Sequence, residues 1–264
     1  MLGAIIGDII GSVYEFNNIK TKDFPLFSDG CAFTDDTVMT IAVAEALSNG
    51  GKPDNFIDSM KKFGRMYPYL SYGESFCRWL FSSDREPYNS FGSGSAMRVS
   101  PCALFANSLK EAESLAEKSA AVTHNHPEGS KGAQSTAAAI YLARTGEAKR
   151  SIKEYIKRQY GYNLSRTLDE IRPVYRFNET CQETVPEAII AFLEANNFED
   201  AIRNAISLGG DSDTLAAITG SIAGAFYPVP DTITASAFFY LDKPLLDVIG
   251  VLLKSGHLPG IISK

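Results

Sequence analysis

The sequence predicts an all-α fold in which residues 1–264 form a single compact multi-helix domain. Apolar residues recur at the three- and four-residue spacing of amphipathic helices from one end of the chain to the other. No train of segments with alternating apolar and polar residues indicates a β-sheet. No linker-like or low-complexity segment divides the chain, and its length suits one large domain.

Each expected helix is a segment with this periodicity. The second begins near Asp35 and ends before Gly50 and Gly51, and the third follows Pro53, which suits the first turn of a helix. Two later segments also open near a proline. Residues 161–181 show the weakest helical pattern and are expected to form a long ordered loop. In chain order, the expected helices cover residues 2–14, 35–47, the segment after Pro53, 109–122, 127–145, 185–196, 213–226 and 245–255.

Glycines recur every four residues in two of these helices. Gly3, Gly7 and Gly11 share one face of the first helix, and Gly220 and Gly224 share one face of a late helix. Such smooth strips allow helices to approach closely. We interpret these glycines as packing residues that place helices, with no chemical role.

Composition and charge argue against several protein classes. The net charge of −6 disfavours a general affinity for nucleic acid or for anionic lipid. A small phosphate-bearing ligand is still compatible, because a bound divalent cation reverses the local charge. The four cysteines are widely spaced and form no C-x-x-C pair, which favours reduced thiols in a cytosol over a zinc site or a disulfide framework.

The apolar N-terminal segment predicts neither a signal peptide nor a membrane span. Residues 1–16 lack a basic region and contain Asp8. They are also shorter than the roughly 20 apolar residues needed to cross a bilayer. The later apolar run of residues 241–253 is interrupted by Asp242, Lys243 and Asp247. We expect a soluble cytoplasmic protein with no membrane partner.

Two short acidic segments run directly into apolar helices and carry the clearest chemical signal. They are FTDDT at residues 33–37 and GGDSDT at residues 209–214. Helix capping explains either one taken alone, because Asp and Thr are favoured N-cap residues and negative charge suits a helix N-terminus. Capping needs only one side chain, however, and each segment supplies two carboxylates that would repel one another without a cation.

Carboxylates and hydroxyls with no nearby His or Cys describe a site for a hard cation such as Mg²⁺, Mn²⁺ or Ca²⁺. Gly209 and Gly210 allow a sharp turn, so that Asp211 and Asp213 can converge. The spacing does not match the calcium loop of an EF-hand. The aspartates of the two segments are sufficient to hold two cations about 3.5–4 Å apart, an arrangement that activates water.

Three further features have both a structural and a functional interpretation. The FGSGSAMR segment, residues 91–98, is either a plain loop or a glycine-rich turn whose free N–H groups receive a phosphate or a ribose. His124 and His126 lie in the sequence THNHP, where Pro127 suits a helix start and His126 can act as a cap or turn residue. Glu15, at the end of the first expected helix, is by itself most simply a solvated acid.

Taken together, these segments resemble the ADP-ribosylglycohydrolase family, which includes the glycohydrolase that reactivates dinitrogenase reductase. The resemblance spans almost the whole chain and keeps the family order of its motifs, which are GAIIGDIIGSVYEF, TDDT, FGSGSAMR, THNHP and SLGGDSDTLAAITGSIAGAFY. It implies an all-α fold of the ADP-ribosylglycohydrolase type with a cleft that holds two divalent cations, either Mg²⁺ or Mn²⁺.

The resemblance also implies roles for individual residues. Glu15 matches a family glutamate that lies beside the metals and is the first candidate for proton transfer, with Asp36 and Asp213 as the alternatives. Ser93 stands where the family often has Asn, and Phe91 where some members have Tyr, so the acceptor preference stays open. Adenine is expected to stack on Phe91 or on a tyrosine. The implied metal shell consists of Thr34, Asp35, Asp36, Asp211, Asp213 and Thr214, and the implied ligand contacts are Ser90, Phe91, Gly92, Ser93, Gly94 and His124.

The implied activity is metal-dependent hydrolysis of the glycosidic bond between ADP-ribose and an acceptor, with the metals positioning the distal ribose and a water molecule. The acceptor is expected to be a protein side chain, a base or a small metabolite. Three alternatives stay open: a non-catalytic ADP-ribose-binding or regulatory protein of the same fold, an immunity protein that binds an ADP-ribosylating toxin, and a two-metal phosphatase. The complete set of aspartates argues against the first. The choice between Mg²⁺ and Mn²⁺ and the oligomeric state stay open.

Overall fold

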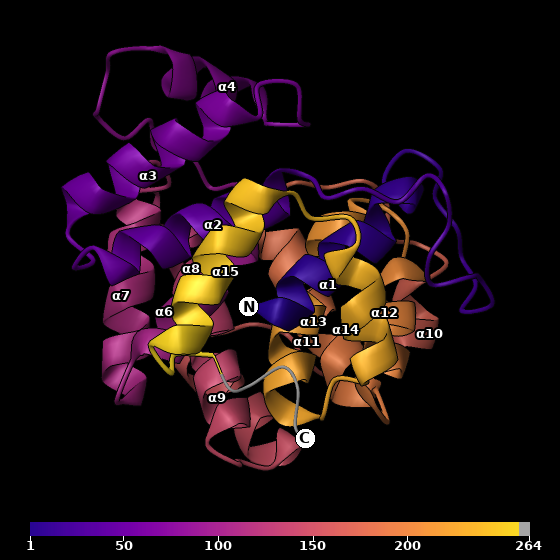
Figure 1. The fold of residues 1–264 in the computed structure, drawn as a ribbon. Helices are drawn as coiled ribbons and strands as arrows, with labels where there is room; N and C mark the ends of the chain where they lie inside the picture. Colours follow the sequence, from indigo (N-terminus) through magenta and orange to yellow (C-terminus); the bar gives the residue numbers. More distant parts are fainter. Residues whose placement is uncertain (259–264) are drawn as a thin grey trace.

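Two glycine-lined helices pack against each other at the centre of the molecule (Figure 1). They are α1 (Leu2–Gly11) and α13 (Ser212–Phe226). A Cβ atom on Gly3 would collide with the backbone carbonyl of Gly220, and one on Gly7 would collide with the backbone of Ala216. Only glycine allows this separation of the two backbones, so the glycine strip brings the N-terminal and C-terminal parts of the chain into direct contact.

The computed structural model describes residues 1–258, and within them all regular secondary structure is helical except for an isolated bridge between Gly92 and Thr180. The prediction of an all-α fold is therefore confirmed. The remaining elements, in chain order, are the 3₁₀ turn η1 (Ser12–Tyr14), α2 (Asp35–Ser48), α3 (Pro53–Met66), α4 (Glu74–Phe81), α5 (Gly94–Met97), α6 (Ser100–Phe105), α7 (Leu109–Ala121), α8 (Pro127–Arg144), α9 (Lys149–Tyr160), α10 (Leu168–Ile171), α11 (Cys181–Glu194), α12 (Phe198–Ile206), α14 (Asp231–Phe238) and α15 (Lys243–Lys254).

Every helix expected from the sequence is present, but several others were missed. The missed helices are short or carry few buried residues: α9, for example, buries only Ile152 and Ile156, and its remaining residues give little apolar signal. The α-helical part of the first segment ends at Gly11 and tightens into η1. The loop expected over residues 161–181 contains one helical turn, α10, which Thr167 and Glu170 close with a capping box.

Helix α11 begins at Cys181, four residues before the expected start at residue 185, and Pro186 lies inside it. Proline lacks a backbone N–H and disfavours the interior of a helix. Here Pro186 lies five residues after the start of the helix. The first residue of the helix, Cys181, donates its backbone N–H to the carbonyl of Phe91 at 3.0 Å. The helix start is therefore set by a contact with a distant segment that the local sequence does not reveal.

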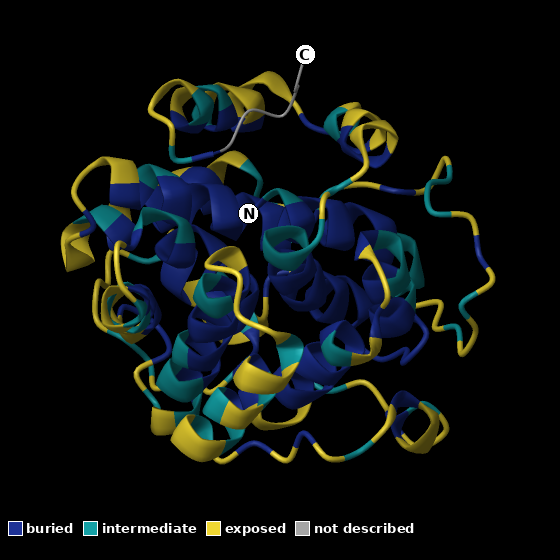
Figure 2. Cartoon of the chain, turned by 90° about the horizontal axis from the view of Figure 1, so that it is seen from below, coloured by how far each residue is buried: buried dark blue, intermediate teal, exposed yellow. Residues whose placement is uncertain are grey.

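The core is built from the central helices, and the outer helices expose one side (Figure 2). Helix α13 is buried from Ser212 to Ala223, and α2 is buried over most of its length. Helix α1 packs on α13 and α14, and α15 packs on α2. Both ends of the described chain thus contribute to one continuous helical core.

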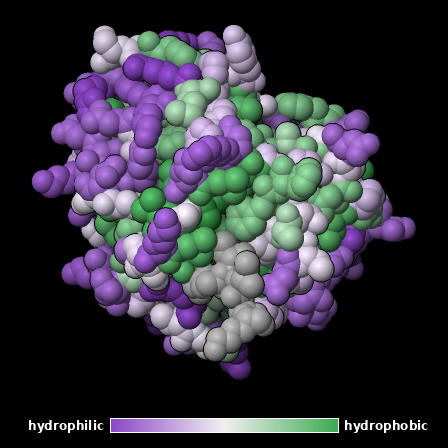
Figure 3. All heavy atoms as spheres, in the orientation of Figure 1, coloured by the Kyte–Doolittle hydropathy of each residue, from purple (hydrophilic) through white to green (hydrophobic). Residues whose placement is uncertain are grey.

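The helices and the surface were compared with what a membrane span requires. Among the helices of residues 1–258, none is both long and apolar enough to cross a bilayer. In the view of Figure 3, apolar residues gather over α15, and hydrophilic residues cover the side toward α3. The apolar residues include Val251 and Leu246 of α15, which are partly exposed.

Candidate functional site

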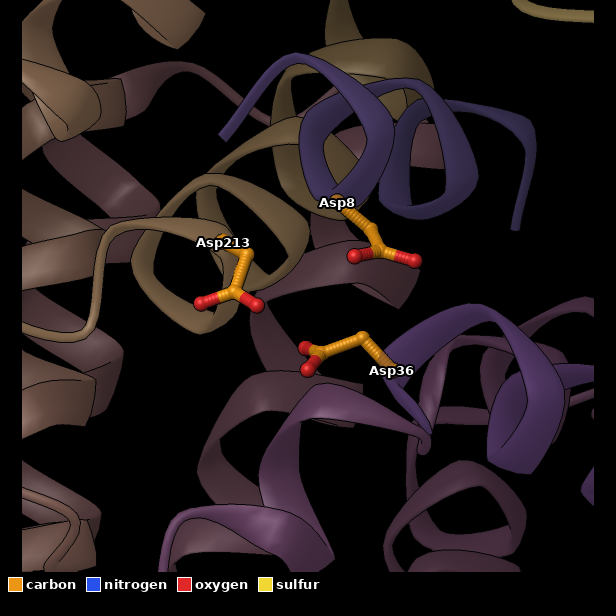
Figure 4. A group of neighbouring side chains, drawn as sticks. All are labelled: Asp8, Asp36 and Asp213. Carbon is orange, nitrogen blue, oxygen red and sulfur yellow. The ribbon is translucent and has the colours of Figure 1, made fainter. Parts of the chain in front are cut away.

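Three aspartates from three helices point toward one another beside the α1–α13 contact (Figure 4). Asp8 comes from α1, Asp36 from the first turn of α2 and Asp213 from the first turn of α13. Each offers a carboxylate oxygen, and these oxygens all lie within 4.8 Å of one another. All three side chains are buried, so their carboxyl groups lie close together and are shielded from water.

Asp8 occupies the position of a second N-cap for α2. Its Oδ2 accepts hydrogen bonds from the backbone N–H groups of Thr34 at 2.9 Å and Thr37 at 3.0 Å, and its Oδ1 accepts one from the Thr34 hydroxyl at 2.7 Å. These bonds satisfy N–H groups that the first turn of a helix leaves without a partner. Asp8 therefore fixes the N-terminus of α2, and with it Asp36, against α1.

A second carboxylate group consists of Glu15, Asp211 and Asp213, whose oxygens also lie within 4.8 Å of one another. Glu15 follows η1, and Asp211 follows the turn at Gly209 and Gly210, which have φ angles of +67° and +73°. Such positive values favour glycine, as the sequence predicted for this turn. Asp213 belongs to both groups and joins them into one acidic site.

The two predicted threonines lie in the same site. The Thr34 hydroxyl donates to Asp8 and accepts a hydrogen bond from the backbone N–H of Asp36 at 3.3 Å. The Thr214 hydroxyl donates to Asp36 Oδ2 at 3.2 Å. Asp35 is half-buried and faces the adjoining cleft, outside the two close groups.

Burial and mutual repulsion raise the pKa values of these acids. Burial is the largest cause and the charge of Asp213 the next for Asp8, whose pKa rises to about 7, and for Glu15 and Asp35, whose pKa values rise to about 8. The pKa values of Asp36 and Asp211 are also raised, again by burial first and by Asp213 second. In the metal-free fold these acids therefore keep protons near neutral pH, and a bound cation would displace them.

The donor set fits hard divalent cations. The two groups contain only carboxylates, the ligands that Mg²⁺, Mn²⁺ and Ca²⁺ prefer. Asp36 is 2% exposed, and its Oδ1 has no hydrogen-bond partner within residues 1–258, which is costly for a buried anion. A cation would use this oxygen, and the sharing of Asp213 suits a pair of cations.

A cleft of about 270 Å³ opens beside the acidic site. The segment of residues 90–94 forms part of its wall, held by hydrogen bonds from Ser93 N–H to the Glu179 carbonyl at 2.7 Å and from Gly92 N–H to Ser90 Oγ at 3.2 Å. Residues that line the cleft and were singled out in the sequence are Glu15, Asp35, Asp36, Ser90, Gly92, Ser93, Gly94, His124, Asp211, Asp213 and Thr214.

Phe91 differs from its neighbours, because it does not line the cleft. It is 44% exposed, and its ring lies 5.3 Å from that of His126. The predicted contact of Phe91 with adenine stays a prediction. Phe177, from the loop before α11, is an aromatic residue that does line the cleft.

The two histidines of the THNHP segment have different surroundings. His126 is the N-cap of α8 and accepts from the backbone N–H of Glu128 at 3.1 Å, one of the roles considered for it from the sequence. His124 is buried in the cleft wall, and its Nδ1 shares a hydrogen bond with the Thr123 hydroxyl at 2.8 Å. Burial, followed by the charge of Arg98, holds the pKa of His124 well below its usual range. The ring is therefore neutral and able to donate or accept through Nε2.

Sequence reasoning missed several residues of the site. Asp8 had one available signal, a carboxylate in the middle of an otherwise apolar glycine-rich helix. Arg98 closes the FGSGSAMR motif and lines the cleft while 1% exposed. Phe177 and Glu179 also line it, but they lie in a loop whose sequence carries no chemical pattern.

Comparison with known proteins identifies the family of the chain. A sequence model of the ADP-ribosylglycohydrolase family matches residues 1–235. The chain belongs to this family. It is accordingly a hydrolase of the ADP-ribosylglycohydrolase type, and the resemblance predicted from the motifs is confirmed.

Relatives within the family match the chain over most of its length. Human ADP-ribosylhydrolase ARH3 is 26% identical, over 93% of this chain and 90% of the human protein. The chicken (Gallus gallus) ARH3 is 27% identical, over 86% of this chain and 84% of its own. ADP-ribosylarginine hydrolase Tri1 of Pseudomonas putida is 28% identical, over 87% of this chain and 70% of its own.

A solved structure shows the same fold. It is described as an ADP-ribosylglycohydrolase-related protein complex and matches with a TM-score of 0.66 and 24% identity. The match covers 90% of this chain and 96% of that chain. The helical arrangement described above is therefore the arrangement of an ADP-ribosylglycohydrolase.

Proposed function

We propose that the protein is a metal-dependent hydrolase that cleaves the glycosidic bond between ADP-ribose and an acceptor. One observation carries the proposal: two groups of carboxylates share Asp213 beside a cleft whose wall contains residues 90–94 and His124. The site thus combines an uncompensated acidic centre with a cleft wall of small polar residues. Membership of the ADP-ribosylglycohydrolase family supports this reaction class.

The residues expected to hold the cations are Thr34, Asp35, Asp36, Asp211, Asp213 and Thr214. When bound, two Mg²⁺ or Mn²⁺ ions would fix ribose hydroxyls and lower the pKa of water. Asp8 has a supporting part, because its oxygens already accept hydrogen bonds from Thr34 and Thr37 and so orient α2. Glycine at positions 209 and 210 lets Asp211 turn toward Asp213.

Glu15 is the first candidate for proton transfer. It lines the cleft and lies beside Asp213. In the metal-free fold, burial and then the charge of Asp213 raise the pKa of its carboxyl group to about 8, and bound cations would lower this pKa. A group with a pKa near the working pH is an efficient general acid or base. Asp36 and Asp213 are the alternatives, but both are expected to be occupied as cation ligands. We assign the proton to Glu15.

The part of the cleft wall formed by residues 90–94 and His124 is proposed to receive the rest of ADP-ribose. Ser90, Gly92, Ser93, Gly94 and His124 all face the cleft. The Nε2 atom of His124 lies close to the glycines: a Cβ on Gly94 would lie 3.2 Å from it. Glycine at position 94 thus keeps a neutral hydrogen-bonding group accessible beside the backbone of this segment.

The partner is proposed to be an ADP-ribosylated protein or a small ADP-ribose conjugate. The names of the relatives describe ADP-ribosylhydrolases and, for Tri1, an ADP-ribosylarginine hydrolase. A cytoplasmic location stays our proposal, as does the single domain over residues 1–264. Binding to an ADP-ribosylating toxin stays a prediction, and co-purification with a toxin would test it.

The deciding experiment is incubation with arginine-linked and serine-linked ADP-ribose peptides, with and without Mg²⁺ or Mn²⁺. We expect release of ADP-ribose and the unmodified acceptor from one of them, and only with metal. Full activity after exhaustive chelation would contradict metal dependence. Release of inorganic phosphate would indicate a two-metal phosphatase, and tight binding without release would indicate a non-catalytic ADP-ribose-binding protein.

A further inference from the structure

Asn18 connects the two sides of the acidic site through its side-chain amide. It lies three residues after Glu15, in the irregular segment that follows η1. Its Nδ2 group lies 2.7 Å from the backbone carbonyl of Tyr14 and 2.8 Å from that of Glu15, and these two neighbouring carbonyls share one of its two N–H groups. The same group donates to the Gly210 carbonyl at 2.9 Å, and Oδ1 accepts from the Gly210 N–H at 2.7 Å.

The Gly210 backbone therefore has both of its polar groups paired with one side chain. Gly210 lies in the turn between α12 and α13 and directly precedes Asp211. Its φ of +73° favours glycine, and a Cβ there would lie 2.7 Å from the Tyr175 ring. Backbone hydrogen bonds from α12 hold the turn as far as Gly209, whose N–H donates to the Ile206 carbonyl at 3.0 Å. At Gly210, the next residue, the bonds to Asn18 take over.

Two neighbouring contacts also hold the segment after η1 in place, but neither bonds the backbone of Glu15 or Gly210. Lys20 Nζ donates to the carbonyls of Tyr175 and Leu208. The ring of Phe16 stacks on that of Phe177 with centroids 6.3 Å apart. Asn18 differs from both, because it bonds the backbone of Glu15 on one side and of Gly210 on the other.

The site needs such a connection because its acids repel one another. Glu15, Asp211 and Asp213 hold carboxylate oxygens within 4.8 Å, and like charges at this separation favour moving apart. Asn18 itself is an exposed residue, so core packing does not explain its hydrogen bonds. Asn18 bonds the backbone of Glu15 and that of Gly210, which directly precedes Asp211. These bonds therefore help to place Glu15 and Asp211.

We propose that Asn18 is a positioning residue that holds the Glu15 segment against the Gly210 turn and so sets the separation of Glu15 and Asp211. The inference rests on the proposed function, in which these two acids act at one site. Asn18 does not touch the reacting atoms. It acts through the backbone on both sides.

The test compares Asn18→Leu, which has a similar size and no hydrogen bonds, with the control Asn17→Leu. Asn17 is also exposed and makes no side-chain hydrogen bond within residues 1–258. Turnover and KM are measured on the peptide that the parent protein hydrolyses, and Mn²⁺ affinity is measured by calorimetry. For Asn18→Leu we expect kcat to fall about 10- to 100-fold, the weight of a misplacement near 1 Å, with KM within about threefold. Mn²⁺ affinity should fall several-fold, and Asn17→Leu should match the parent in all three quantities.

Hydrogen exchange gives a readout that does not depend on activity. The Gly210 amide should be protected in the parent and should exchange faster in Asn18→Leu. If Asn18→Leu does not fold, Asn18→Asp serves in its place, because it keeps the acceptor for Gly210 N–H but loses both donors. Unchanged kcat and Mn²⁺ affinity in a folded Asn18 variant, even with a lower melting temperature, would overturn the inference. Absence of metal-dependent hydrolysis in the parent would overturn the proposed function instead, and the exchange and Mn²⁺ comparisons would still decide the role of Asn18.

Discussion

At the scale of single residues, Asp8 shows how one carboxylate can serve packing and chemistry together. It is buried in α1, yet its oxygens close the first turn of α2 through Thr34 and Thr37. The same side chain lies against Asp36 and Asp213 and adds to the charge of the site. Its removal has two opposing effects on stability. The donors of Thr34 and Thr37 lose their acceptor, which destabilises the fold, and the repulsion within the acidic site decreases, which stabilises it.

We predict that Asp8→Ala lowers the free energy of unfolding by about 2–4 kcal/mol, since each buried donor left without a partner costs about 1–3 kcal/mol and the relief of repulsion offsets part of this. Urea denaturation with and without Mg²⁺ would measure the change. Asp231→Ala, which alters an exposed aspartate in the first turn of α14, is the control and should have a much smaller effect. Equal stability of Asp8→Ala and the parent would show that the cap is not needed.

Glu15 tests chemistry separately from binding. Glutamine keeps its size and one oxygen but cannot exchange a proton near neutral pH, so Glu15→Gln should lower turnover by about 10²–10⁴-fold. Affinity for ADP-ribose, measured by calorimetry, should stay within a few-fold. The control is Glu117→Gln, which alters an exposed carboxylate of α7 outside the cleft and should leave turnover nearly unchanged. If binding falls together with turnover, Glu15 is mainly a metal or substrate ligand.

At the scale of elements, the contact between α1 and α13 positions the site. Asp8 lies beside Gly7, on the helix whose glycines lie against Ala216 and Gly220. Asp213 lies at the start of the partner helix, next to Gly11. Backbone contact between the helices therefore sets the distance between carboxylates of two chain segments about 200 residues apart in the sequence.

Gly7→Ala is predicted to destabilise the protein by about 1–3 kcal/mol or more, because the new methyl group meets the Ala216 backbone and must push the helices apart. The affinity of Gly7→Ala for metal should also decrease, because Asp8 and Asp213 would move apart. Gly250→Ala is the matched control: Gly250 lies in α15 with open space around it, and alanine there should stabilise the helix by about 0.5–1 kcal/mol. Thermal melting and Mn²⁺ calorimetry on both variants would check this, and identical behaviour of the two would refute the close-packing argument.

At the scale of the whole molecule, the acidic site couples stability to pH and to cations. In the metal-free fold the pKa of Asp8 is about 7 and those of Glu15 and Asp35 are about 8, all above their ordinary values. Between about pH 4 and pH 8 these three groups therefore bind more protons in the folded state than in the unfolded chain. Stability present at low pH is then lost as the pH rises through these pKa values.

We expect this site to make the melting temperature of the metal-free protein lower at pH 8 than at pH 5.5. Mg²⁺ or Mn²⁺ should raise the melting temperature more at pH 8 than at pH 5.5. Cations bind deprotonated carboxylates and stabilise the folded state by mass action. Calorimetric melting at both pH values, in chelator and in millimolar metal, would measure the effect, and Asp213→Asn should reduce the metal response. A melting temperature that does not change with metal at pH 8 would count against a cation site.

The sequence by itself determined the fold class, the family and most of the acidic centre. Helical periodicity and glycine strips are local patterns, and they reported helices and close packing correctly because each depends on neighbours three or four residues away. The two acidic helix starts were visible because two carboxylates exceed what a cap requires. Those patterns also located Asp36, Asp211 and Asp213 without any knowledge of their distances.

Only the tertiary structure decided which of these segments contact one another and through which residues. Asp8 enters the site because a helix crossing, not its own sequence, carries it to Thr34 and Asp213. Phe177 and Glu179 reach the cleft, and Asn18 reaches Gly210, through contacts between segments far apart in the chain. Phe91 belongs to the predicted ligand segment, yet its ring turns toward His126 beside the cleft. Local sequence encodes which element a residue belongs to, whereas the partners of its side chain depend on how the elements pack.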